Sequence, residues 1–91
     1  MRVQVRGELD LATSPELGDV LERELDQGRA VVVDLARVTF IDSTALNTLV
    51  SALKSCESNG GRLAVRSTLP AQVSRVFEIT GLDAVLPLAR E

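Results

Sequence analysis

Residues 34–46, with the sequence DLARVTFIDSTAL, constrain the fold more than any other segment of the chain. The segment begins at the end of an apolar, mostly β-branched run over residues 30–35. Such a run is typical of a strand buried in a parallel sheet. A helix is expected to start at Ser43 after a short loop, because apolar residues then recur at helical spacing at Leu46, Leu49, Val50 and Leu53. The segment therefore predicts a buried strand, a short loop and a well-anchored helix whose first residue is a serine.

Ser43 stands at the predicted start of this helix, where two roles are open to it. Its side chain can cap the helix by accepting a hydrogen bond from a free backbone N–H in the first turn. The same position suits a phosphate group, because free N–H groups and the helix dipole favour negative charge there. Position alone favours the cap, since helix caps are common and phosphate-accepting serines are rare. Thr44 is expected to be an ordinary first-turn residue or a secondary phosphate acceptor.

Strands and helices are expected to alternate along the rest of the chain. Apolar residues predict a first strand over residues 3–9 that ends in a turn. A helix follows, with a Thr13-x-x-Glu16 capping box at its start and an end at Gly28. The remaining elements are a helix from Ser43 to about Ser58 that stops at residues 59–61, a strand over residues 63–65, a helix between Pro70 and Gly81, and a short edge strand over residues 85–88. This order predicts one α/β domain spanning residues 1–91, with a small mixed, mostly parallel sheet and helices packed against it.

Composition excludes several classes of function. The formal net charge of −3 argues against a surface for nucleic acids or anionic membranes. The chain has no histidine and a single cysteine, Cys56, so no ordinary structural zinc site or histidine-based catalytic set can form, and no metal is expected. Without a glycine-rich phosphate-binding loop, neither a cofactor nor enzymatic activity is expected. Cys56 follows Leu53 on the apolar side of its helix and should be buried and inert, and the lack of a second cysteine indicates a cytoplasmic protein.

Five short motifs follow one another along the chain: Gly7-Glu8-Leu9-Asp10, Val33-Asp34-Leu35, the segment 38–46, Asn59-Gly60-Gly61 and Thr80-Gly81-Leu82. In order and spacing they resemble the motifs of a STAS domain. The match extends from about residue 3 to residue 88, and the Phe-Ile-Asp-Ser-Thr sequence of residues 40–44 is its most specific part. The chain closely resembles the bacterial anti-sigma factor antagonists, which are also called anti-anti-sigma factors.

This resemblance implies a function that composition and periodicity do not reveal. In that family the unphosphorylated antagonist binds an anti-sigma factor, which is also an ATP-dependent serine kinase, and so frees the sigma factor. The kinase phosphorylates the serine after the aspartate of the helix-opening motif, which corresponds to Ser43. Phosphorylation switches binding off, and a phosphatase reverses it. The resemblance therefore implies a phosphoprotein of transcription regulation that works by partner switching and is a substrate rather than an enzyme.

The same resemblance implies a partner-binding site around the helix start, made of Asp10, Asp42, Ser43, Thr44 and Ala45. Asp42 either complements the positive end of the helix, or it orients the serine hydroxyl group or contacts the kinase. Asp10 is either a turn residue or a partner contact, because the ends of parallel strands lie where neighbouring helices begin. The acidic residues of the preceding helix, at positions 16, 19, 22, 24 and 26, are expected to form a solvated face rather than to steer a basic partner.

The chain departs from the family pattern in three places. Ala45 stands where the family usually has glycine, which keeps a small residue at a point of close approach. The family's usual first strand and its C-terminal helix are both expected to be absent from this chain. An exposed sheet edge would result, and with it a weak homodimer through edge-strand pairing.

An alternative function is a constitutive STAS subunit, for example in a lipid-transport ABC complex or a signalling assembly. Relatives associated with transporters tend to carry threonine or another unphosphorylated residue at the position of Ser43, so a serine there favours the switch. Binding of a small molecule or nucleotide at the same helix end has little support without a phosphate-binding loop. Neither nucleic acid nor membrane is an expected partner.

Overall fold

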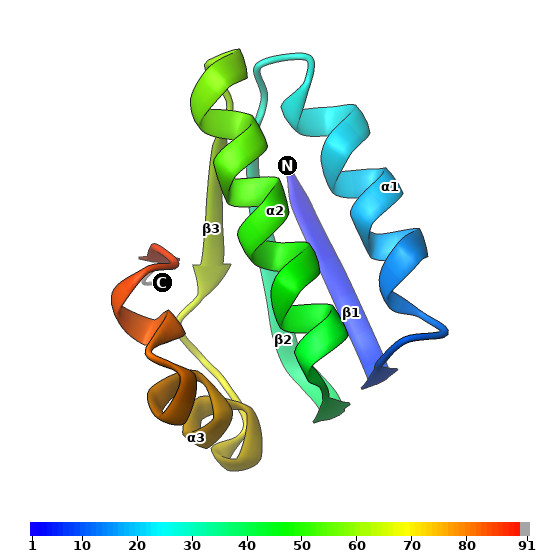
Figure 1. Cartoon of the computed structure of the whole chain (residues 1–91), viewed down its shortest axis with the longest axis vertical. Helices are drawn as coiled ribbons and strands as arrows, with labels where there is room; N and C mark the ends of the chain where they lie inside the picture. The colour runs from blue at the N-terminus through cyan, green and yellow to red at the C-terminus, as the bar shows by residue number, and fades with distance from the viewer. Residues whose placement is uncertain (90–91) are drawn as a thin grey trace.

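A computed structural model describes residues 1–89. Its centre is one sheet of four strands in the order β1-β2-β3-β4 (Figure 1). In chain order the elements are β1 (Arg2–Leu9), α1 (Ser14–Leu25), β2 (Ala30–Ile41), α2 (Ser43–Asn59), β3 (Arg62–Arg66), α3 (Ala71–Thr80), the 3-10 helix η1 (Leu82–Ala84) and β4 (Leu88–Ala89). The predicted α/β domain with a small sheet is confirmed, but within the described residues every strand pairing is parallel, so the sheet is not mixed.

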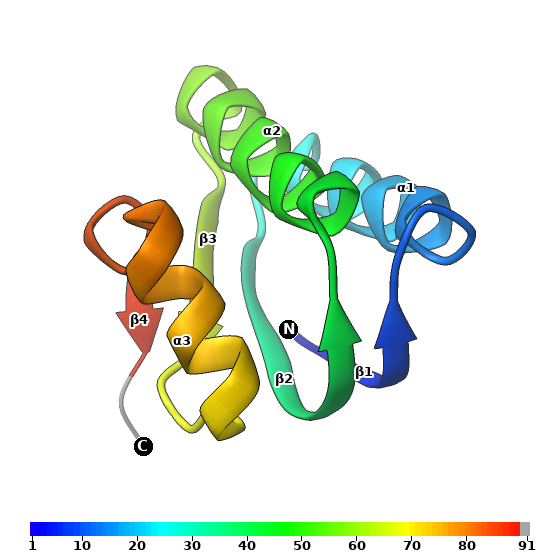
Figure 2. The ribbon, with the colours of Figure 1, turned by 60° about the horizontal axis from the view of Figure 1, so that its bottom comes forward.

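Helices α1 and α2 lie side by side across one face of the sheet (Figure 2). Each connects two neighbouring parallel strands, and the strands advance in the same direction across the sheet. Because such crossovers are right-handed, both helices fall on the same face. Helix α3 packs beside β2 and next to η1. This arrangement brings the ends of β1 and β2 to the start of α2 (Figure 1).

Strand β2 is longer than the sequence predicts. The strand over residues 30–35 is confirmed, but the expected loop after it is wrong, because the strand continues to Ile41. Strand β1 pairs with β2 along this continuation, and register shifts after Gln4 and around Gly7 let β2 accommodate one additional residue each time. In this continuation of β2, Val38 and Ile41 are buried, with 1% and 7% exposure. Pairing with β1 and burial of these side chains therefore carry the strand to the edge where α2 begins.

The core lies between the sheet and the helices that cover it. Its largest fully buried side chains are Phe77, Leu9, Leu21, Leu25, Leu35 and Leu49. Cys56 is 2% exposed, so its predicted burial is confirmed, and its lack of reactivity stays a prediction. Ala45, Leu46 and Leu49 of α2 belong to the same core, which anchors the helix that starts at Ser43.

Glycines end two helices as predicted. Helix α2 stops at Gly60 and α3 stops at Gly81, with φ angles of 77° and 76° that residues with side chains rarely adopt. The last strand, by contrast, is shorter than predicted and covers only residues 88–89, although it lies at the sheet edge as expected. Pro87 has no N–H group to donate to a neighbouring strand. It bonds to β3 only through its carbonyl oxygen, which accepts a hydrogen bond from the Val65 N–H.

Asp34 of β2 is 1% exposed and links three strands through its side chain. Its Oδ2 accepts hydrogen bonds from Arg2 of β1 at 2.9 Å and from Arg66 of β3 at 2.8 Å. Its Oδ1 accepts a hydrogen bond from the Ala36 N–H at 3.0 Å. The Ala36 N–H, together with the two arginines, outweighs the effect of burial and holds the pKa of Asp34 below its ordinary value of 3.8.

Asp34→Asn should lower the free energy of unfolding by about 1–2 kcal/mol at neutral pH, because the amide loses two charge-assisted hydrogen bonds. The loss stays modest since Arg2 is 56% exposed and solvent screens its charge. The folded-state pKa of Asp34 is lowered, so its stabilising contribution is complete above the ordinary pKa of 3.8 and disappears as the pH falls through the folded-state value.

Urea unfolding of wild type and Asp34→Asn at neutral pH and at a series of pH values below the ordinary pKa of 3.8 measures this difference. Asp19→Asn, an exposed substitution on α1, is the control and should have little effect at any of these pH values. A loss in Asp34→Asn that does not shrink on acidification would show that the carboxylate charge is not its cause.

Candidate partner-binding site

The candidate site lies where β1 and β2 end and α2 begins (Figure 1). Two short connections meet there: residues 10–13 between β1 and α1, and the single residue Asp42 between β2 and α2. All five predicted site residues belong to these connections or to the first turn of α2. The fold therefore brings the residues predicted from the sequence to one edge of the sheet.

Asp42 holds this edge together through both oxygens of its carboxylate. Oδ1 accepts a hydrogen bond from the Ala45 N–H at 3.0 Å and so caps α2. Oδ2 accepts a hydrogen bond from the Leu11 N–H at 3.2 Å, which ties the turn after β1 to the start of α2. The Asp42 N–H donates to the carbonyl oxygen of Leu9 at 3.2 Å. Asp42 therefore takes the capping role that the sequence analysis assigns to Ser43.

Ser43 is the first residue of α2 and is exposed. The prediction that it caps the helix is wrong, because the carboxylate of Asp42 already fills that role. Within residues 1–89, no group forms a hydrogen bond with the Ser43 hydroxyl group, so Asp42 does not orient it. The hydroxyl group is accessible and takes no part in the bonding that holds the helix start.

Asp10 organises the turn between β1 and α1. Its Oδ1 accepts hydrogen bonds from the N–H groups of Ala12 at 3.0 Å and Thr13 at 3.1 Å. The Thr13 hydroxyl group accepts a hydrogen bond from the Asp10 N–H at 2.9 Å and donates to the Glu8 carbonyl oxygen at 3.0 Å. Thr13 precedes α1 without a side-chain cap bond, because its hydroxyl group is engaged in this turn. The predicted capping box with Glu16 is therefore wrong.

Two of the predicted residues lie deeper at this edge. Thr44 is half-buried, and its carbonyl oxygen accepts a hydrogen bond from the Thr48 hydroxyl group at 3.0 Å. Ala45 is 0% exposed over the whole residue and packs in the core, so neither its side chain nor its backbone is accessible to a partner. The predicted site thus presents one exposed residue, Ser43, among three half-buried ones, Asp10, Asp42 and Thr44.

Two large apolar side chains at this edge are missing from the prediction. Leu11, in the turn after Asp10, is 72% exposed, and Phe40, near the end of β2, is 50% exposed. The N–H of Leu11 is one of the two groups bonded by Asp42. Phe40 stands opposite Glu8 in the β1–β2 register. Their exposure follows from how the strand ends are folded, and no local sequence pattern indicates it.

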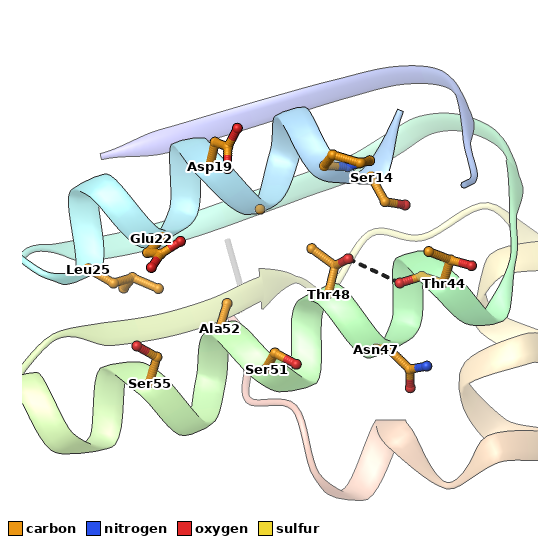
Figure 3. A pocket seen from close by; sticks show the side chains of 12 residues that line it. Ser14, Asp19, Glu22, Leu25, Thr44, Asn47, Thr48, Ser51, Ala52 and Ser55 are labelled. Atoms are coloured by element: carbon orange, nitrogen blue, oxygen red, sulfur yellow. Dashed lines mark hydrogen bonds between the residues drawn. The ribbon is translucent and has the colours of Figure 1, made fainter. Parts of the chain in front are cut away.

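A groove of about 480 Å³ runs between α1 and α2 and reaches Thr44 (Figure 3). Asp19 and Glu22 line it from α1, and small polar side chains line it from α2. The two helices approach closely at Gly18, where a Cβ atom would lie 3.3 Å from the Thr48 side chain. The two carboxylates belong to the acidic face that the sequence predicts to be solvated, and they leave this groove negatively charged.

The polar groups at this edge are carboxylates and hydroxyl groups. Within residues 1–89, no three His, Cys, Asp or Glu side chains are placed to hold a metal ion together. In the same part of the chain, no helix combines the length and apolarity that a membrane crossing requires. The carboxylates of Asp10 and Asp42 accept hydrogen bonds from backbone N–H groups, and Ser43 follows with an exposed hydroxyl group. The edge is therefore negatively charged and held by backbone hydrogen bonds, and the hydroxyl group of Ser43 is exposed and forms none of these bonds.

Comparison with known proteins assigns this fold to a family. The sequence model of the family described as "Mlab, STAS domain" matches residues 1–88, and the chain belongs to the STAS domain family. Proteins named anti-sigma-B factor antagonist, from Staphylococcus aureus and Staphylococcus epidermidis, are 41% identical to it over 85 residues. These alignments cover 92% of this chain and 78% of each relative.

Solved structures of anti-sigma factor antagonists share the fold. One from Mycobacterium paratuberculosis is 30% identical with a TM-score of 0.76, and the alignment covers 96% of this chain and 74% of that one. A putative anti-sigma factor antagonist from Thermotoga maritima is 27% identical with a TM-score of 0.83, covering 99% and 77%. Unphosphorylated SpoIIAA, at 18% identity and a TM-score of 0.81, covers 99% and 77% and shows likeness of fold alone. The resemblance to the anti-sigma factor antagonists that the motifs predict is confirmed.

Asp42→Ala should lower the free energy of unfolding by about 1–2 kcal/mol, because the N–H groups of Ala45 and Leu11 lose their acceptor. Ser43→Ala should change it by less than about 0.5 kcal/mol, since the hydroxyl group caps nothing. Chemical denaturation of both variants beside wild type measures the two effects. A loss in Ser43→Ala as large as that in Asp42→Ala would show that the cap is assigned to the wrong residue.

Proposed function

We propose that this chain is an anti-sigma factor antagonist regulated by phosphorylation of Ser43. Its unphosphorylated form binds an anti-sigma factor with serine kinase activity and thereby frees a sigma factor. Phosphorylation by that kinase switches binding off, and a phosphatase restores it. The observation that carries the proposal is the exposed, unbonded hydroxyl group of Ser43 in a chain 41% identical to proteins named as antagonists.

The start of α2 is suited to a phosphorylated serine. Because Asp42 caps the helix, modification of Ser43 removes no hydrogen bond that is formed among the described residues. Free N–H groups and the helix dipole at this end favour an added negative charge. We therefore expect the fold to survive phosphorylation without a large loss of stability.

The phosphate group should act on the partner interface instead. It adds about −1.5 to −2 charges at neutral pH. The half-buried carboxylates of Asp10 and Asp42 already make this edge negative. A partner would have to desolvate the phosphate group next to these carboxylates and would lose the space that it occupies. A loss of about 3 kcal/mol weakens binding roughly a hundredfold, which is enough to release a kinase.

In this role the chain is a ligand and a kinase substrate rather than an enzyme, and it uses no cofactor. We place its contacts with the anti-sigma factor at Asp10, Asp42, Ser43 and Thr44, whereas the buried Ala45 anchors the start of α2 in the core. The proposal assigns the protein to the cytoplasm, with the kinase and the phosphatase as partners and without direct contact to nucleic acid or membrane.

The second candidate function is that of a constitutive STAS subunit of a transport or signalling complex. It is considered because the matching family carries the description "Mlab, STAS domain". Such a subunit would need no modification of Ser43. Pull-down from the native lysate with wild type and Ser43→Glu separates the two functions. Loss of a kinase from the variant supports the switch, whereas equal recovery of transporter subunits by both proteins supports the alternative.

Ser43→Glu should weaken binding to the purified anti-sigma factor about tenfold to a hundredfold, somewhat less than phosphate because one carboxylate carries less charge. Ser43→Ala should bind like wild type and act as a permanent antagonist. Ser58→Glu, an exposed substitution near the other end of α2, is the matched control and should bind normally. Isothermal titration calorimetry compares all four proteins. Wild-type affinity in Ser43→Glu would contradict repulsion at the interface.

Incubation with the cognate kinase and ATP should add one phosphate group to wild type and none to Ser43→Ala. Mass spectrometry of the peptides that contain residues 43 and 44 locates the modification. We expect it on Ser43, because Ser43 is exposed whereas Thr44 is half-buried. Full modification of Ser43→Ala at Thr44 would move the phosphorylation site by one residue.

A further inference from the structure

We infer that Leu11 and Phe40, here called the apolar rim, are hydrophobic anchors that insert into apolar pockets on the anti-sigma factor. This inference rests on the proposed function, since it names further contacts of the same interface and their chemistry. It assigns much of the binding affinity to two side chains other than the proposed phosphorylation site, Ser43.

Leu11 is exposed on a turn that is held in place. Its side chain is 72% exposed, yet its N–H is bonded to Oδ2 of Asp42 at 3.2 Å. On the preceding residue, Oδ1 of Asp10 accepts hydrogen bonds from the N–H groups of Ala12 and Thr13. A side chain presented on such a turn loses little conformational freedom when it is buried by a partner. Leu11 therefore has the properties of an anchor residue rather than of an ordinary loop residue.

Phe40 is exposed on β2, directly after the register shift at which Thr39 is the additional residue. The chain has two phenylalanines, and the other one, Phe77, is 1% exposed, whereas Phe40 is 50% exposed. Its neighbour Ile41 is buried opposite Leu9, whereas Phe40 stands opposite the exposed Glu8, so adjacent residues on β2 face opposite sides and Phe40 points away from the core beneath α2. Phe40 lies two residues before Asp42 in the sequence, on the strand that leads to Ser43. An aromatic residue held in this way is typical of the residues that dominate binding energy at interfaces.

The apolar rim would also strengthen the effect of one phosphate group on binding. Apolar contacts exclude water from the groups that they surround, which raises the cost of burying a charge there. The carboxylates of Asp10 and Asp42 lie at the same edge, so the partner surface should combine apolar pockets with positive charge. The phosphate group on Ser43 would then lose its hydrating water on binding, which it would keep if it lay at the solvent-exposed rim of the interface.

The chain offers a matched control for this inference. Ile79 is 74% exposed, which is similar to Leu11, but it lies near the end of α3. Gln72 in the first turn of α3 donates a hydrogen bond to the Thr39 carbonyl oxygen of β2 at 3.2 Å, whereas Ile79 is at the other end of that helix. Ile79→Ala therefore removes an exposed apolar side chain of comparable size outside the edge.

Calorimetric titration with the purified anti-sigma factor, repeated at several temperatures, tests the inference. Leu11→Ala and Phe40→Ala should each weaken binding about tenfold or more and make the heat capacity change of binding less negative, because less apolar surface is buried. Leu11→Met should keep most of the affinity, and Ile79→Ala should match wild type in both quantities. Thermal melting of each variant checks that it is folded. If Phe40→Ala does not fold, Phe40→Thr takes its place, and the same loss of affinity is expected.

Wild-type affinity in Leu11→Ala and Phe40→Ala, with Ser43→Glu still impaired, would overturn the apolar rim and leave the proposed function standing. A loss in Ile79→Ala equal to that in Leu11→Ala would also overturn it, because the effect would not belong to this edge. Failure of wild type itself to bind the anti-sigma factor would overturn the proposed function and this inference together.

Discussion

The arrangement of the candidate site depends on the carboxylate of Asp42. Its two oxygens accept hydrogen bonds from backbone N–H groups of two different segments, Ala45 in α2 and Leu11 in the turn after β1. One side chain thereby holds the start of the helix and the position of the turn. Ser43, the next residue, contributes nothing to this bonding among the described residues, and its hydroxyl group faces solvent.

This division of roles between two adjacent residues allows a switch without a change of fold. Asp42 stabilises the start of α2, so Ser43 can be modified without the loss of a stabilising bond. The same edge combines the negative charge of Asp10 and Asp42 with the exposed side chains of Leu11 and Phe40. In the proposed function, the apolar side chains supply affinity for the anti-sigma factor, and the phosphate group on Ser43 abolishes it.

Local patterns predict much of this fold but not the details of its functional edge. Gly60 and Gly81 end helices because the backbone there needs a positive φ angle, and this requirement is visible in the sequence. The extension of β2 over residues 36–41 depends on pairing with β1, a strand distant in sequence, so a local pattern cannot reveal it. The family motif indicates the candidate site, but it does not distinguish Asp42 from Ser43 as the cap. That choice depends on the backbone, which is extended at Asp42, with φ −116° and ψ −179°, as a cap requires.

The central claim is that phosphorylation acts on the interface and leaves the fold intact. The most direct test is the free energy of unfolding of the protein phosphorylated once on Ser43, compared with that of the unmodified protein by chemical denaturation. Since Asp42 holds the start of α2, the two values should agree within about 0.5 kcal/mol. A loss of more than about 2 kcal/mol would contradict the account, because it would mean that the bonding at the helix start depends on the Ser43 hydroxyl group.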